Sequence, residues 1–300
     1  MITIESITVV LDPTVLRDPV LDRAKTLARS TGAKIQFLIN CHSILDEKSY
    51  FSIDHAASGK NANSVFQDVI LQSLKNEFLL LDVPITIELF DSADVVAEIV
   101  ERAGLTGADL VLKSTHHHSN LRKGILTNTD WKLIRQCPIP IWFSKPGAWL
   151  ARGDIVAAVD PLHNLAEQTR LDSLLIDYAE YYARKSQQTA CVYHAFFGSS
   201  EPSSAALASN TASVELKRQH NQAVYRLLAY HNIDPANVRI DIGDLGDKLL
   251  NYLGNVRSNL LVIGALSRNK LERAIVGSTA EKILDECPCD VLVVKPESGK

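Results

Sequence analysis

The sequence predicts an α/β protein with two tandem domains, each built around a parallel β-sheet. Two observations support this fold class: the chain repeats with a period of about half its length, and short apolar runs alternate with segments of helical periodicity. Its length adds a third, because single hydrophobic cores usually stop growing well before 300 residues. We therefore expect two separate cores.

The internal repeat defines the domains. A shift of 150 positions superposes Cys137-Pro138 on Cys287-Pro288 and Lys145-Pro146 on Lys295-Pro296 without a gap. Asp12-Pro13 and Asp160-Pro161 each follow an apolar run near the start of a half. Proline and glycine interrupt the strand pattern near Pro146–Gly153, so we expect domains at residues 1–148 and 149–300.

The predicted strands of the second half are apolar at consecutive positions, which is typical of parallel strands covered on both faces. They are Ile155–Asp160, Thr189–Phe196, Val238–Ile242, Leu260–Gly264 and Asp290–Val294, and the last strand of the first half is predicted at Ile139–Ser144. Between strands, Leu245, Leu249, Leu253 and Val256 recur at helical spacing, as do Val95, Ile99 and Arg102-Ala103.

Two polar segments break this rhythm, at about Cys41 to Asn63 and Gly198 to Ser213. Each follows the second strand of its half. Such connections either pass over a binding crevice or are simply mobile, and both interpretations stay open.

Composition excludes several function classes. A net charge of -4, with 31 basic and 35 acidic residues interspersed, provides no basic surface for nucleic acid or an anionic membrane. The N-terminus does not resemble a signal peptide and no long apolar stretch occurs, so we expect a cytoplasmic protein. The five cysteines are too scattered for a disulfide framework and are interpreted as reduced structural thiols.

A glycine-containing loop in the second half is the main candidate site. Gly264 ends the fourth predicted strand, and Gly277-Ser278 opens the next predicted helix. A helix N-terminus with free backbone amides and a hydroxyl suits a phosphate group. The same residues also fit ordinary helix capping by Ser278 with Glu281.

The segment LLVIGALSRNKLERAIVGSTAEKILDECPCDVLVVKP resembles the carboxyl-terminal part of universal stress protein domains. The family pattern is G-x-x-G, nine residues, then G-[ST]; here Ser267 replaces the second glycine. The resemblance implies flavodoxin-like domains, similar to adenine nucleotide alpha hydrolases, each with a five-stranded parallel sheet in order 3-2-1-4-5 and helices on both faces. It also implies an ATP site, with Mg as counter-ion, formed by Asp160, Pro161, Ala195, Gly264, Ser267, Gly277 and Ser278.

The first half carries the same resemblance in LVLKSTHHHSNLRKGILTNTDWKLIRQCPIPIWFSKP, but without the glycines. Side chains stand where backbone amides would approach phosphate, so this site is predicted to be degenerate. Its K-x-x-H and T-x-T-D-W features resemble the E-type tandem stress proteins. The corresponding positions are Asp12, Ser114, His117, Thr127 and Asn128.

Other candidate sites have simpler explanations. His116-His117-His118 could suggest a metal, but successive residues do not converge on one ion in regular structure, so a polar surface loop is favoured and no metal site is predicted. Phosphate screening by Arg268, Lys270 and Arg273 competes with an ordinary solvated loop, because Glu272 lies among them. Packing explains Trp131, Trp142 and Trp149 as well as a ligand would.

No catalytic residues are predicted, since the phosphate-loop lysine motif and the nucleophile-elbow motif are both absent. The family resemblance implies a stress-response regulator that binds ATP or a related adenine nucleotide in its second domain and acts on a protein partner. It also implies a homodimer or an intrachain pseudo-dimer. The alternatives are a scaffold or a binder of another small ligand and, more distantly, a slow ATPase.

Overall fold

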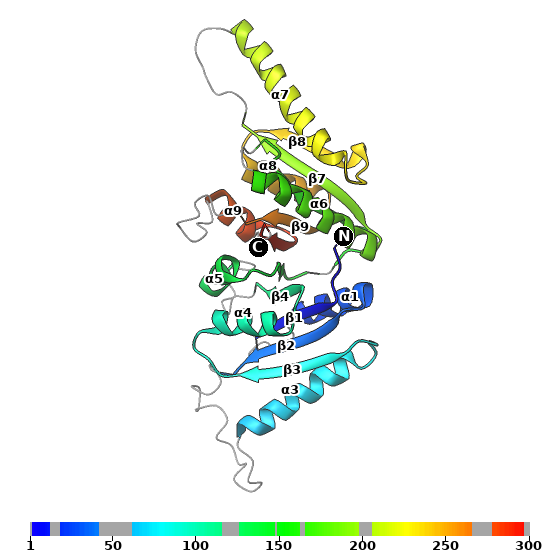
Figure 1. Cartoon of the computed structure of the whole chain (residues 1–300), viewed down its shortest axis with the longest axis vertical. Helices are drawn as coiled ribbons and strands as arrows, with labels where there is room; N and C mark the ends of the chain where they lie inside the picture. Colours follow the sequence, from blue (N-terminus) through cyan, green and yellow to red (C-terminus); the bar gives the residue numbers. More distant parts are fainter. Residues whose placement is uncertain are drawn as a thin grey trace. The chain divides into compact units, whose positions relative to one another are not determined.

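The computed structural model describes residues 2–12, 19–41, 62–115, 126–147, 149–162, 166–197, 206–265 and 278–296. They belong to two compact units, each described separately here (Figure 1). The N-terminal unit comprises Thr3–Ser114 and Asn128–Ser144. The C-terminal unit comprises Lys145–Lys300 together with Met1–Ile2 and Thr115–Thr127.

The N-terminal unit contains a parallel sheet in the order β3-β2-β1-β4-β5. Its strands are β1 (Ser6–Leu11), β2 (Lys34–Asn40), β3 (Ile85–Phe90), β4 (Leu110–Ser114) and β5 (Ile141–Ser144). Its helices are α1 (Pro19–Thr31), α3 (Ala62–Phe78), α4 (Val95–Leu105) and α5 (Asn128–Gln136). Every residue of β1 is buried, as expected for a central strand covered on both faces.

The C-terminal unit repeats this arrangement as β8-β7-β6-β9-β10. Its strands are β6 (Asp154–Ala158), β7 (Thr189–Phe196), β8 (Val238–Ile242), β9 (Ser258–Gly264) and β10 (Asp290–Val294). Its helices are α6 (Ala166–Ser186), α7 (Ala206–Leu228), the 3-10 turn η1 (Pro235–Asn237), α8 (Leu245–Asn255) and α9 (Ser278–Glu286). Counted within each unit, both sheets have the predicted order 3-2-1-4-5.

The two units also share side-chain hydrogen bonds at equivalent positions. Asp109 Oδ2 accepts from the backbone N–H groups of Glu5 and Ser6 at 2.8 and 3.0 Å, just where β1 begins. Asn259, 150 positions later, accepts from the Leu150 N–H and donates to the Leu150 carbonyl, both at 2.8 Å, ahead of β6. In each unit, a side chain at the start of the fourth strand therefore holds the backbone near the start of the first strand.

Several predicted boundaries were wrong: β6 and β9 begin earlier than expected, at Asp154 and Ser258, and α8 ends at Asn255, one residue before Val256. β6 ends at Ala158, because the Asp160 N–H leaves the sheet and donates to Asp172 Oδ1 at 3.1 Å. β5 begins at Ile141 and not at Ile139, because Pro140 has no N–H to donate to a neighbouring strand. The polar segment expected to extend to Ser213 instead becomes helical at Ala206.

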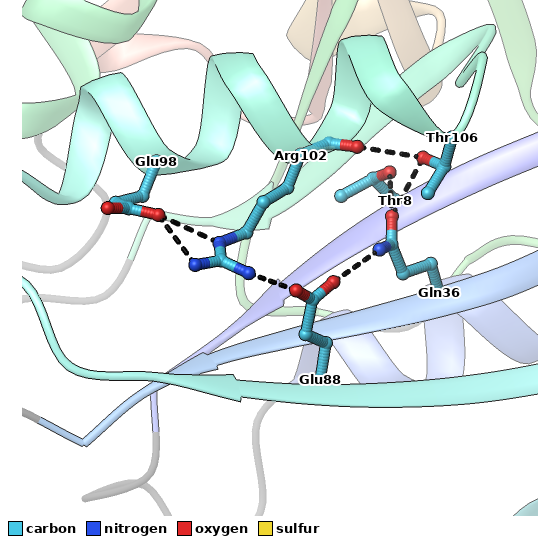
Figure 2. A network of polar contacts seen from close by, with 6 residues as sticks. All are labelled: Thr8, Gln36, Glu88, Glu98, Arg102 and Thr106. Carbon is cyan, nitrogen blue, oxygen red and sulfur yellow. Dashed lines mark hydrogen bonds and ion pairs between the residues drawn. The ribbon is translucent and has the colours of Figure 1, made fainter.

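A polar network joins α4 to the sheet in the N-terminal unit (Figure 2). Arg102 pairs with Glu98 and Glu88, and Gln36 donates to Glu88 Oε2 at 2.9 Å. Gln36 Oε1 in turn accepts from the hydroxyls of Thr8 and Thr106 at 3.1 and 2.9 Å. This network satisfies the polar groups that β1, β2 and β3 present to α4.

Candidate functional site

The predicted nucleotide site lies at the carboxyl edge of the sheet in the C-terminal unit. β6 is hydrogen-bonded to β7 on one side and to β9 on the other, with Ala157 opposite Val262. Asp160 follows β6 and Gly264 ends β9, so residues far apart in sequence meet at neighbouring strand ends. In parallel α/β sheets this edge, at the point where the strand order reverses, is the usual ligand position.

The other predicted residues are only partly described. Pro161 follows Asp160, Ala195 lies in the adjacent strand β7, and Ser278 begins α9. Ser267, Gly277 and the side chain of Ser278 lie outside the described residues, as do Arg268, Lys270 and Arg273. The structure thus brings together the strand-end residues of the prediction.

Asp160 is held through its backbone, because its N–H donates to Asp172 Oδ1 of α6. Asp172 is fully buried, whereas Asp160 itself is exposed. A buried carboxylate thus fixes the chain at the end of β6 and leaves the Asp160 side chain accessible to a ligand.

Gly264 has a packing role that the sequence did not reveal. A Cβ atom at this position would lie 2.5 Å from Leu171 Cδ2 and 3.1 Å from Leu171 Cγ. Leu171 belongs to α6 and is completely buried. The glycine therefore lets α6 approach the end of β9, in addition to any contact with a ligand.

A histidine pair lies beside Asp160 and was not predicted. His194 Nδ1 is 2.9 Å from the Val159 carbonyl oxygen, and His194 Nε2 is 2.7 Å from His220 Nδ1 of α7. A carbonyl can only accept, so His194 carries its proton on Nδ1 and, when neutral, accepts from His220 at Nε2. Phe196 stacks on His220 with ring centroids 3.8 Å apart. The only sequence signal was a histidine in a buried strand.

Burial lowers the pKa of both His194 and His220 below the ordinary value of 6.5, and for His220 the neighbouring His194 acts in the same direction. The hydrogen bond to the Val159 carbonyl opposes the shift of the His194 pKa, and the nearby Asp160 carboxylate opposes the shifts of both pKa values more weakly than burial. The pair is therefore neutral at pH 7.

Acidification should destabilise the C-terminal unit. The unfolded chain takes up these protons near pH 6.5, whereas the folded unit takes them up only at lower pH. The stability contributed by the neutral pair is thus complete above 6.5 and is lost as the pH falls from 6.5 towards the lowered folded pKa values. This loss of stability can be measured as the difference between the midpoints of denaturant unfolding at about pH 7.5 and about pH 5.5. A His194→Gln, His220→Asn variant should lose less stability on acidification, and an equal loss would contradict the assignment.

The first half of the chain places the degenerate counterparts in the same way. Asp12 follows β1 and Ser114 ends β4, and these strands are neighbours with Val10 opposite Lys113. Thr127 precedes α5, which begins at Asn128. His117 and the whole His116–His118 run lie outside the described residues.

An ion pair occupies the helix start in the N-terminal unit. Lys113 Nζ lies 2.8 Å from Asp130 Oδ1 and also donates to the Ser114 carbonyl at 3.1 Å. The Asp130 side chain is 0% exposed and that of Lys113 is 18% exposed. Asp130 lies in the first turn of α5, where a carboxylate supplies the negative charge that the helix dipole favours.

The C-terminal unit has no such pair at the equivalent positions. A shift of 150 places Ile263 at the position of Lys113 and Ala280 at that of Asp130. The two units therefore differ at this position: the N-terminal unit has a buried carboxylate there, whereas the first turn of α9 has its acidic residue one position later, at Glu281.

The remaining sequence interpretations can be placed briefly. All five cysteines are buried free thiols. Trp142 is fully buried in β5, as its packing role predicted. No described helix combines the length and hydropathy needed to cross a membrane. Among the described residues, Asp177, Glu180 and His231 form a cluster of possible metal ligands that was not predicted.

Comparisons with known proteins agree with this architecture. The model of the universal stress protein family matches residues 3–145 and 155–295, one match per repeat. The chain is 25% identical to universal stress protein E of Escherichia coli K12 over 304 residues, covering 98% of this chain and 94% of that protein. It is 26% identical to the universal stress protein E homolog of Haemophilus influenzae over 215 residues, covering 69% and 67%.

Solved structures give the same result. The crystal structure of a putative universal stress protein from Pseudomonas aeruginosa UCBPP-PA14 matches with a TM-score of 0.76 and 25% identity, covering 98% of this chain and 94% of that one. A universal stress protein from Archaeoglobus fulgidus shares the fold at a TM-score of 0.62 and 16% identity, covering 96% and 98%. The chain belongs to the universal stress protein family, with two domains of that family in tandem as in the E-type proteins that it resembles.

Proposed function

We propose that the C-terminal unit binds ATP or a related adenine nucleotide, with Mg as counter-ion, and that the protein acts as a stress-response regulator in the cytoplasm. The observation that carries this proposal is the meeting of Asp160 and Gly264 at adjoining ends of β6 and β9. The proposed site consists of these two residues with Pro161, Ala195, Ser267, Gly277 and Ser278.

The described residues fit a nucleotide in three respects. The Asp160 carboxylate is exposed at the strand end, where an adenine amino group or a ribose hydroxyl can donate to it. Gly264 is exposed and adds no side chain at the end of β9. The start of α9 has Ala280 where the N-terminal unit has a buried carboxylate, so at that position no side chain repels a phosphate, and the acidic residue of the first turn is the next one, Glu281.

The same comparison argues against nucleotide binding in the N-terminal unit. There a phosphate would have to displace the Lys113–Asp130 pair or approach the buried Asp130 carboxylate. Both are costly, because separating a buried ion pair leaves an uncompensated charge. We therefore infer one nucleotide per chain and assign the N-terminal unit a structural or partner-binding role.

Titration of nucleotide-stripped protein with Mg-ATP tests the proposal by calorimetry. We expect one site per chain, and we expect Gly277→Val to abolish binding because its side chain would enter the phosphate position. The matched control is Thr127→Val, which places the same side chain at the degenerate position and should leave the affinity unchanged.

Two results would contradict the proposal. No heat at millimolar ATP would favour the alternative of a scaffold or a binder of another small ligand. Equal binding by wild type and Gly277→Val would refute the site. A separate assay of phosphate release should show no turnover, since we propose regulatory binding rather than catalysis. Size-exclusion chromatography with and without nucleotide tests the proposed homodimer.

A further inference from the structure

Three side chains converge on the surface of the C-terminal unit, away from the proposed nucleotide site. Asp177 and Glu180 lie three residues apart on α6 and so share one face of that helix. His231 lies in the turn after α7, where its backbone N–H donates to the Leu228 carbonyl at 3.0 Å. Their ligand atoms all lie within 4.8 Å of one another.

The His231 ring is placed as a metal ligand would be. Its side chain is 4% exposed, and Nδ1 is buried without a hydrogen-bond partner among the described residues. Nδ1 instead faces two carboxylate oxygens, at 3.4 Å from Asp177 Oδ1 and 3.5 Å from Glu180 Oε2. These separations are longer than an ordinary hydrogen bond. A buried ring nitrogen that faces two carboxylate oxygens without a hydrogen bond to either is suitably placed to bind a cation together with them.

The two distances from His231 Nδ1 match a tetrahedral zinc site. Zinc binds imidazole nitrogen and carboxylate oxygen at about 2.0–2.2 Å, so two ligands at a tetrahedral angle lie about 3.4 Å apart. Both His231 distances agree with this separation. The Glu180 carboxylate is also held in position by the backbone, because its other oxygen, Oε1, accepts from the Asn232 N–H at 2.6 Å. Hydrogen bonds that orient ligating carboxylates in this way are a general feature of metal sites.

We propose that Asp177, Glu180 and His231 bind a divalent transition-metal ion, with Zn²⁺ the best match. One imidazole and two carboxylates suit zinc, whereas calcium and magnesium favour sites made of oxygen ligands alone. Asp177 is 46% exposed and Glu180 is 26% exposed, so the ion can enter from solvent and a fourth position remains for water. The metal would link α6 to the segment between α7 and β8 and would stabilise the packing of the two.

This site is independent of the proposed nucleotide. Asp177 and Glu180 lie in the part of α6 that runs away from the carboxyl edge of the sheet, towards the start of β7. We assign the ion a structural role in the α6–α7 layer, so failure of nucleotide binding would not affect this proposal.

Zinc binding can be measured on the full chain after removal of metals with a chelator. We expect calorimetry to give one Zn²⁺ per chain and the thermal midpoint to rise with Zn²⁺. Asp177→Asn and His231→Gln should each weaken binding by at least roughly 10–100-fold, the loss seen when even a supporting residue is removed. Asp177 is half-exposed, so its variant tests the site without disturbing a buried ring.

The matched control replaces His116, His117 and His118 by alanine, because these three consecutive histidines are a competing metal-binding candidate. This variant should bind Zn²⁺ like the wild type. Co²⁺ in place of Zn²⁺ should give a spectrum without a thiolate charge-transfer band, since all five cysteines are buried elsewhere.

Three results would overturn the proposal: no binding at millimolar Zn²⁺, unchanged affinity in both Asp177→Asn and His231→Gln, or loss of binding only in the His116–His118 variant. The first would leave His231 simply packed beside the two carboxylates. The last would move the metal to the other histidines.

Discussion

Replacing Asp130 by alanine should lower the free energy of unfolding of the N-terminal unit by about 3–5 kcal/mol, the usual cost of removing one member of a buried ion pair. Asp130 is completely buried, and its loss leaves the Lys113 ammonium at 18% exposure without that carboxylate. The first turn of α5 also loses its only acidic residue. Denaturant unfolding followed by tryptophan fluorescence measures the change, because Trp131 and Trp142 both belong to this unit.

The control for this prediction uses the residues of the other unit. Lys113→Ile together with Asp130→Ala recreates the Ile263 and Ala280 pair of the C-terminal unit. Apolar replacement of a complete buried pair is often neutral or stabilising, so the double variant should recover most of the stability lost in the single variant. If the free energy of unfolding of Asp130→Ala lay within about 0.5 kcal/mol of the wild-type value, the ion pair would have to be open to water, which would contradict the prediction.

Replacing Gly264 by alanine should lower the free energy of unfolding of the C-terminal unit by about 1–3 kcal/mol, as is usual when an added methyl group overlaps a tightly packed side chain. The new Cβ would lie 2.5 Å from Leu171 Cδ2, well inside van der Waals contact. Leu171 is fully buried and cannot move into solvent. Chemical denaturation of the variant and the wild type gives the difference.

A matched substitution isolates this packing effect. Gly254 lies in α8 with no atom within 4 Å of an added Cβ, so Gly254→Ala makes the same chemical change in open space. It should raise stability by up to about 1 kcal/mol, because alanine favours the helix. Leu171→Ala should also lower the free energy of unfolding by less in the Gly264→Ala variant than in the wild type. Equal effects of the two glycine substitutions would contradict the proposed contact.

Much of the fold could be predicted because apolar patterns report burial directly. Three strands, Thr189–Phe196, Val238–Ile242 and Asp290–Val294, have the predicted bounds. The periodicity of Leu245, Leu249 and Leu253 likewise corresponds to α8. The errors fall where hydrogen bonding, and not hydrophobicity, sets the boundary, as at Asp160, whose N–H turns away from the sheet to Asp172.

The candidate site could be predicted only in outline. The repeat and the Gly264 to Ser278 spacing identified the strand ends and the helix start from sequence alone, since those features are local. The meeting of Asp160 with Gly264 followed from the parallel order of the sheet. The packing of Gly264 against Leu171 could not be predicted, because it depends on how closely one helix approaches one strand.

The sequence by itself determined the fold class, the duplication and the loss of glycines in the first half, because periodicity and spacing are properties of the chain. Only the tertiary structure decided which charged and titratable groups meet: Lys113 with Asp130, His194 with His220, and His231 with Asp177 and Glu180. The physical reason is that electrostatic and coordination energies depend on distances of a few ångströms between separate elements. Those distances are set by packing and leave no pattern along the sequence.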